Sequence, residues 1–211
     1  GILMNSKTVI TIGRQFGSGG KEIGEKLAKE LGIRCYDKEL LAVAAKESGL
    51  CKELFENHDE KPTNSFLYSL VMDTYSLGYT SSYSDMPINH KVFLAQFDAI
   101  KKLAERESCV IIGRCADYAL EDNPYAMSIY IKADMDKRVK RIMTKYQLNE
   151  SKASDMIQKE DKRRASYYNY YSSKKWGDAK SYDLCLDSGK LGVEGSIELI
   201  KDFIALREKN F

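Results

Sequence analysis

Glycines and basic residues lie close together near the start of the 211-residue chain, in the stretch GRQFGSGGK from Gly13 to Lys21. Glycines let consecutive backbone N–H groups turn toward one point, where a Cβ atom would block the close approach of a ligand. Such a nest suits phosphate oxygens, and a helix that begins there adds roughly half a positive charge. The pattern indicates a phosphate-binding loop; the alternative is a glycine-rich turn without a ligand. The candidate residues are Gly13, Arg14, Gly17, Ser18, Gly19, Gly20, Lys21 and Glu22.

The stretch departs from the strict phosphate-binding motif G-x-x-x-x-G-K-[ST]. If Lys21 is taken as the motif's lysine, Gln15 stands where the first glycine belongs and Glu22 where the Ser or Thr belongs. If Gly17 to Gly19 is laid on the G-x-G of nucleotide kinases, the lysine position falls on Gly20 and the threonine position on Glu22. In either register two positions of the motif are occupied by other residues.

A basic segment later in the chain offers further positive charge. Residues 132–175 hold thirteen Lys or Arg residues against six Asp or Glu, in a chain whose formal net charge is +2. This distribution suits an anionic ligand, although it also fits a solvated helix face. Because phosphoryl transfer is chiefly positioning plus charge neutralisation, Arg14, Lys21 or an arginine of this segment could replace the missing lysine.

Strands and helices are expected to alternate around these residues. An apolar strand leads into the glycine-rich stretch, and Ile23, Leu27 and Leu31 recur at helical spacing after it. Asp37 follows the second expected strand as a plausible N-cap. Alternation of this kind predicts an α/β fold with a parallel sheet covered on both faces. The five expected strands are Thr8–Ile12, Ile33–Tyr36, Cys109–Ile112, Met127–Ile131 and Tyr182–Leu186.

Six helical segments are expected between and after these strands. They lie at residues 21–31, 40–45, 93–103, 139–146, 149–171 and 193–206. Residues 52–90, with the apolar stretch Phe66–Leu77, fit this alternation less well and are interpreted as an insert. The length favours one domain over residues 4–211. The lack of a secretion signal or a long apolar run predicts a cytoplasmic protein without a membrane partner.

Five segments together resemble the cytidylate kinase-like family: ITIGRQFGSGGKEIG, YDKELL, CVIIGRCADY, YYNYYSSKKWGD and YDLCLDSG. The resemblance runs from about Thr8 to Leu206. It implies the P-loop NTPase fold of nucleoside-monophosphate kinases, with three α/β/α layers and a five-stranded parallel sheet. It also implies a helical acceptor region at about 52–90, a basic lid at about 133–175, and ATP with Mg²⁺ as donor and metal.

The resemblance assigns roles to particular residues. Gly113-Arg114 is similar to the glycine-arginine pair whose arginine binds the acceptor phosphate, and Asp37 matches the acid after the second strand. Arg138, Arg141, Arg163 and Arg164 are the candidates for lid arginines, with Arg141 and Arg164 preferred. Tyrosines near the end of this segment could stack on a base, but such a cluster at helical spacing also fits hydrophobic packing.

One departure from the family concerns the metal. Ile112 stands where true cytidylate kinases have an acid before the glycine, so the usual magnesium ligand is absent. Glu22 and Asp37 are the metal ligands expected in its place, with Asp117 as a further substitute.

Two functions from different classes follow. The first is ATP-dependent phosphoryl transfer to a nucleoside monophosphate such as CMP, or to a related small acceptor that carries a phosphate. The second is a nucleotide-binding or regulatory module with weak chemistry, motivated by the imperfect loop and the missing acid. Nucleic-acid binding through the basic segment ranks last because the charges cluster where a lid belongs. The sequence leaves homo-oligomerisation open.

Overall fold

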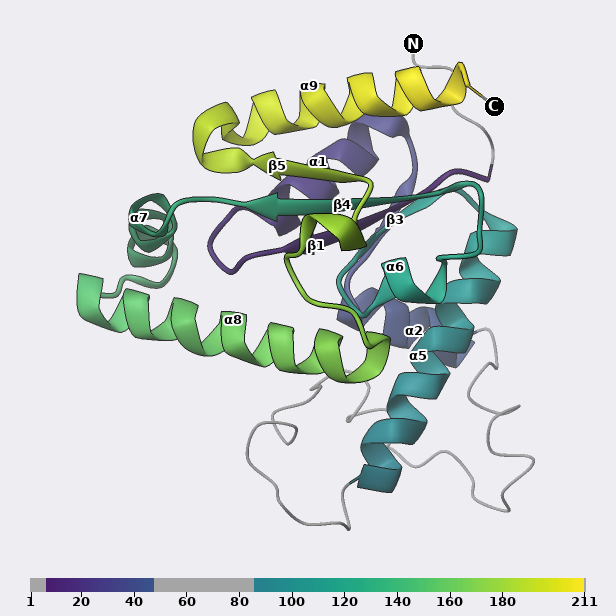
Figure 1. Cartoon of the computed structure of the whole chain (residues 1–211), viewed down its shortest axis with the longest axis horizontal. Coiled ribbons are helices and arrows are strands. Elements are labelled where there is room, and N and C mark those ends of the chain that lie inside the picture. The colour runs from purple at the N-terminus through teal and green to yellow at the C-terminus, as the bar shows by residue number, and fades with distance from the viewer. Residues whose placement is uncertain (1–6, 48–85, 211) are drawn as a thin grey trace.

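The computed structural model describes residues 7–47 and 86–210 (Figure 1). The expected insert therefore lies largely outside the described residues, including the apolar stretch Phe66–Leu77. Its last residues, 86–90, form the first turn of a described helix, α5 (Met86–Arg106). Among the described helices, none is both long and apolar enough to cross a membrane.

Five parallel strands form one sheet in the order β2-β3-β1-β4-β5. Their β-branched runs favour extended backbone, and β3 has all four residues buried. The central strand β1 pairs with β3 on one side and with β4 on the other. The strands are β1 (Val9–Arg14), β2 (Arg34–Tyr36), β3 (Cys109–Ile112), β4 (Ala126–Lys132) and β5 (Leu184–Asp187).

The first strand is longer than the sequence predicted. Gly13 and Arg14 were expected in the loop, but they continue β1 because they pair with Tyr130 and Ile131 of β4. The turn begins only at Gln15, whose N–H donates to the Ile131 carbonyl at 3.0 Å. Arg14 is therefore the last residue of a strand, and its position is fixed by the sheet.

Helices cover both faces of the sheet and complete three layers (Figure 1). On one face, α1 (Gly20–Leu31) and α9 (Ser188–Glu208) bury residues such as Ile23, Leu27 and Ile200 against the strands. On the other face, α2 (Lys38–Glu47), α5 and the short α6 (Ala116–Ala119) enclose a second apolar cluster. The sequence pattern predicted all of these helices except α6, whose four residues are too few to show a period.

Two further helices lie beyond the carboxyl ends of the strands. These are α7 (Met135–Tyr146) and α8 (Glu150–Ser172), which share a small core that includes Ile142 and Ile157 and contacts Phe16. Near its end, α8 packs Tyr167 and Tyr168 into a further apolar cluster. A 3-10 turn, η1 (Ala179–Ser181), then leads into β5.

Candidate active site

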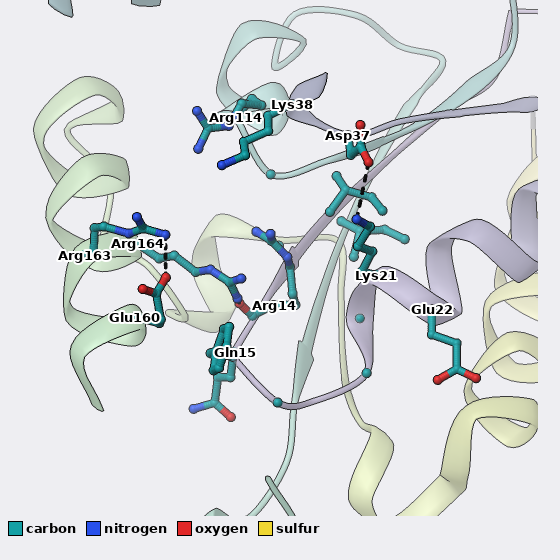
Figure 2. A pocket seen from close by; sticks show the side chains of 18 of the residues that line it. Arg14, Gln15, Lys21, Glu22, Asp37, Lys38, Arg114, Glu160, Arg163 and Arg164 are labelled. Carbon is teal, nitrogen blue, oxygen red and sulfur yellow. Dashed lines mark hydrogen bonds and ion pairs between the residues drawn. The ribbon is translucent and has the colours of Figure 1, made fainter. Parts of the chain in front are cut away.

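A cavity of about 1130 Å³ lies at the carboxyl ends of β1 and β3. Its walls come from the glycine-rich loop, the start of α2, the turn after β3, and α7 and α8. Parallel α/β sheets bind ligands at this edge, because the strands end there and the following helices begin there. The candidate residues from distant parts of the sequence therefore meet around one space (Figure 2).

The loop enters α1 through glycines with left-handed backbone. Gly17 and Gly19 have φ angles of 81° and 82°, a conformation that other residues adopt at a cost. The first N–H groups of α1 have no partner within the helix and are available to an anion. Ser18 is 4% exposed, and its hydroxyl has no hydrogen-bond partner among the described residues. Its carbonyl accepts from Ser188 Oγ at 2.6 Å, which fixes the backbone of the loop.

Arg14 lies closely against two glycines. A Cβ atom at Gly20 would lie 2.6 Å from Arg14 Cβ, and one at Gly113 would lie 2.9 Å from Arg14 Nη1. The side chain thus passes over the start of α1 and reaches the end of β3. Glycine is required at position 20, where the contact is with the base of the arginine, whereas at position 113 the contact is with its flexible guanidinium end.

Four guanidinium groups surround the cavity above the loop (Figure 2). Burial lowers the pKa of Arg14 well below its ordinary value, and three neighbouring positive charges lower it further. In order of effect, these neighbours are Arg164, Arg114 and Arg163. Burial likewise lowers the pKa of Arg164 to about 10. Glu160, which is paired with Arg163, opposes the effect on Arg14. Like charges gathered in this way form a site for a multiply charged anion.

Lys21 points away from this cluster. Its ammonium lies 3.4 Å from Asp37 Oδ2 and 4.0 Å from Glu25, and its side chain is 53% exposed. Figure 2 shows the pair with Asp37. Asp37 also caps α2, since its Oδ1 accepts from Leu40 N at 2.9 Å. Burial would raise the pKa of Asp37, but the Leu40 N–H and the Lys21 charge outweigh it and hold that pKa below its ordinary value.

Glu22 is engaged by two cations. It forms ion pairs with Lys26 at 3.0 Å and with Arg141 of α7. The hydrogen bond from Lys26 lowers the pKa of Glu22 most; burial opposes it, and the bond from Arg141 adds to it. Through this pair Arg141 lies over the loop, where a Cβ atom at Gly19 would be 2.9 Å from its Cζ.

The predicted metal ligands Glu22 and Asp37 are not part of a larger cluster of ligand residues within residues 7–47 and 86–210. That part of the chain has no group of three or more His, Cys, Asp or Glu residues placed to hold a metal ion. Glu22 and Asp37, the predicted ligands, are each already bound to cationic side chains. Asp117 accepts a hydrogen bond from Tyr168 at 2.6 Å, and burial raises its pKa. These surroundings suit a structural carboxyl better than a metal ligand.

Helix α8 is attached directly to the loop backbone. Asp161 Oδ1 accepts from Phe16 N at 2.8 Å, and its Oδ2 forms a 2.7 Å ion pair with Arg138 of α7. Arg164 Nη1 donates to the Arg14 carbonyl at 3.0 Å, and its guanidinium lies 5.3 Å from the Phe16 ring centroid. Hydrogen bonds and an ion pair thus join α7, α8, the end of β1 and the loop.

Comparison with known proteins places this site in a family. A family model described as the cytidylate kinase-like family matches residues 9–190. The chain belongs to the cytidylate kinase-like family. No curated protein matches the sequence.

Solved structures share the fold of this chain. The crystal structure of an uncharacterized protein from Eubacterium ventriosum is 35% identical, with a TM-score of 0.70, and the match covers 93% of this chain and 98% of that one. Two kinases share the fold at low identity. A gluconokinase from Sinorhizobium meliloti is 12% identical, covering 98% and 96% of the two chains, with a TM-score of 0.55. A shikimate kinase from Bacteroides thetaiotaomicron is 14% identical, covering 93% and 98%, with a TM-score of 0.51.

In this member of the cytidylate kinase-like family, the charged residues predicted from the sequence divide into three groups. Arg14, Arg114 and Arg164 meet in the cavity, and Arg163 joins them. Glu22, Asp37, Lys21 and Arg141 also line the cavity, but each is held in an ion pair. Arg138 was a lid candidate, yet it is 7% exposed and bonded to Asp161 and Ala133.

Several contributing residues were not singled out from the sequence. Asp161 and Phe16 join α8 to the loop, and Glu160 provides a negative charge beside the arginines. Tyr167, one of the tyrosines considered for base stacking, lies against Arg114, whose Cζ is 5.0 Å from the tyrosine ring centroid. An acid in a polar helix carries no signal of what it faces, so the sequence could not have identified Asp161 or Glu160.

Proposed function

We propose that the protein transfers the γ-phosphoryl group of ATP to a small acceptor that carries a phosphate, with a nucleoside monophosphate such as CMP as the leading candidate. Membership of the kinase-like family supports phosphoryl transfer as the reaction class. The observation that carries the proposal is the group of four arginines above a glycine-rich loop at the carboxyl edge of the sheet. Arginine binds phosphate through two parallel hydrogen bonds, which fixes both position and charge.

The proposed roles follow the positions of the residues. The backbone N–H groups from Gly17 to Lys21 hold the donor's phosphates. Arg114, which is supported by Tyr167, holds the acceptor's phosphate. Arg164, which donates to the Arg14 carbonyl beside the loop, stabilises the charge that develops on the transferred group. Transfer proceeds in line without a covalent enzyme intermediate, because positioning and electrostatic stabilisation supply most of the catalysis.

Residues 133–175 act as the lid in this proposal. Arg141 and Arg164 extend from α7 and α8 toward the loop. A closed lid excludes water that would otherwise hydrolyse ATP. Asp37 positions the acceptor side of the cavity through its fixed place at the start of α2. Magnesium would enter with the phosphates of ATP, and no step depends on a carboxylate that holds it.

A nucleotide-binding module with weak chemistry is the alternative function. It is favoured by Gly20 at the lysine position and by the engagement of Glu22 in ion pairs. In this alternative the cavity still binds a nucleotide, but no acceptor phosphate is turned over.

Turnover separates the two functions. The purified chain is mixed with ATP, Mg²⁺ and each common nucleoside monophosphate, and ADP release is followed. We expect one acceptor to stimulate release, and Arg114→Gln to raise the KM for that acceptor while ATP binding is retained. Arg106→Gln, at an exposed position at the end of α5, is the matched control. Nucleotide-induced thermal stabilisation without stimulation by any acceptor would leave the module as the function.

A further inference from the structure

Arg14 fills the space that a side chain at position 20 would occupy. A Cβ atom added to Gly20 would lie 2.6 Å from Arg14 Cβ and 2.7 Å from Arg14 Cγ. The Arg14 Cβ atom is fixed by the backbone of β1, so rotation of the arginine side chain cannot relieve the closest contact. Gly20 is also where the motif's lysine falls when Gly17 to Gly19 is laid on the glycines of nucleotide kinases. The arginine stem therefore occupies the path that a lysine at position 20 would take.

The charged end of Arg14 lies where a phosphate-binding group is needed. β1 and β3 are neighbours, with Ile12 beside Ile112, and Arg14 Nη1 reaches the backbone of Gly113 just beyond β3. From there it faces the cavity together with Arg164 and the other arginines. The alternative cation, Lys21, is held by Asp37 and is half exposed.

We propose that Arg14 is the phosphate-binding cation of the loop and takes over, from the end of β1, the task that the motif assigns to a lysine at the start of α1. This deepens the proposed function and rests on it only in taking a nucleotide polyphosphate as the ligand. The cation that binds phosphate therefore comes from position 14 of the sequence and not from position 20, where the motif has its lysine. Glycine at position 20 leaves the space that the side chain of Arg14 occupies.

The proposal predicts that the two positions can be exchanged. Arg14→Gly combined with Gly20→Lys converts RQFGSGG into GQFGSGK, which satisfies G-x-x-x-x-G-K. Glycine is needed at position 14 because the contact involves Arg14 Cβ itself. Gly20→Lys alone places two side chains in one space and should lower the melting temperature. In the double variant that clash is absent.

The test measures binding of ATP and of inorganic tripolyphosphate to the full chain by titration calorimetry. Because Arg14→Gly removes a charged hydrogen-bonding group, we expect it to weaken the binding of both ligands roughly 10- to 100-fold. The double variant should regain most of that affinity, a coupling that two independent sites would not show. Arg14→Gln keeps the stem over Gly20 and removes the charge, so it tests the same loss in a chain with its packing intact. Arg106→Gln is the control for removal of an exposed arginine.

Each outcome decides the proposal. It is overturned if Arg14→Gln binds both ligands as tightly as the unaltered chain, if the double variant binds no better than Arg14→Gly, or if Lys21→Ala loses as much affinity as Arg14→Gln. It is also overturned if the unaltered chain binds neither ligand. If binding depends on Arg14 and no acceptor stimulates ADP formation, the kinase function fails and the assignment of Arg14 stands.

Discussion

Asp161→Ala removes the carboxylate that joins α8 to the phosphate-binding loop. Two contacts are lost, the 2.8 Å bond from Phe16 N and the 2.7 Å ion pair with Arg138. The side chains of Arg138 and Asp161 are 9% and 19% exposed, so solvent cannot replace the carboxylate fully. The substitution leaves a mostly buried guanidinium without its counter-charge and a loop N–H without its acceptor.

The size of the effect follows from this burial. Breaking one side of a buried ion pair destabilises a protein by about 3–5 kcal/mol. Arg138 keeps its 2.9 Å bond to the Ala133 carbonyl, which places the expected loss at the lower end, about 3 kcal/mol. For a chain of this length, that corresponds to a fall in melting temperature of roughly 6–12 °C.

Calorimetric melting at neutral pH checks this prediction. Asp161→Asn keeps an acceptor for the Phe16 N–H. Its melting temperature should therefore lie between those of the alanine variant and the unaltered chain. Asp155→Ala is the matched control, because Asp155 is an exposed acid on the same helix. If Asp161→Ala melts within about 2 °C of Asp155→Ala, less than 1 kcal/mol apart, the junction does not stabilise the fold as described.

Two further predictions concern single residues of the site. Burial raises the pKa of Asp117 above 3.8 even though Tyr168 donates a hydrogen bond to it. The ionised form of Asp117 therefore destabilises the folded state. The free energy of unfolding falls as the pH rises through the folded-state pKa of Asp117. Asp117→Asn should melt higher than the unaltered chain at pH 7, with a gain that shrinks toward pH 3.8; a gain independent of pH would contradict this. Gly19→Ala should destabilise by about 1–2 kcal/mol through its left-handed backbone. It should lose more than Gly32→Ala, whose φ is also positive but whose Cβ would meet no atom within 4 Å, because Gly19→Ala also displaces Arg141. Equal losses in denaturant unfolding would rule out the Arg141 contact.

Most of the fold could be predicted from the sequence because most of its helices and strands have a local sequence pattern of their own. The run Cys109–Ile112 is short, apolar and β-branched, and β3 has the same bounds. Gly32 ends the helical period after Leu31, and α1 ends there with left-handed backbone at Gly32. The first strand was predicted too short because Gly13 and Arg14 have the composition of a loop. Their pairing with β4 is a tertiary contact that local composition does not record.

The candidate site was predicted less completely than the fold. Three sources for the missing charge could be named from the sequence, but Arg14 could not be ranked above Lys21. The distinction depends on directions in space, since one side chain follows the strand into the cavity and the other turns toward Asp37. Arg138 and Arg141 lie three residues apart on α7, yet one is buried in a structural pair and the other reaches over the loop. Helical spacing alone could not separate those two roles.

Glu160 gives the arginine cluster an internal counter-ion. It is paired with Arg163 and lies close enough to Arg14 to offset part of the surrounding positive charge. A tethered carboxylate competes at a high effective concentration, so an incoming anion has to displace it. A small monovalent ion gains too few contacts to do so, whereas a polyphosphate can engage several guanidinium groups at once. We therefore expect the site to favour ligands with several negative charges over the monovalent anions of the medium.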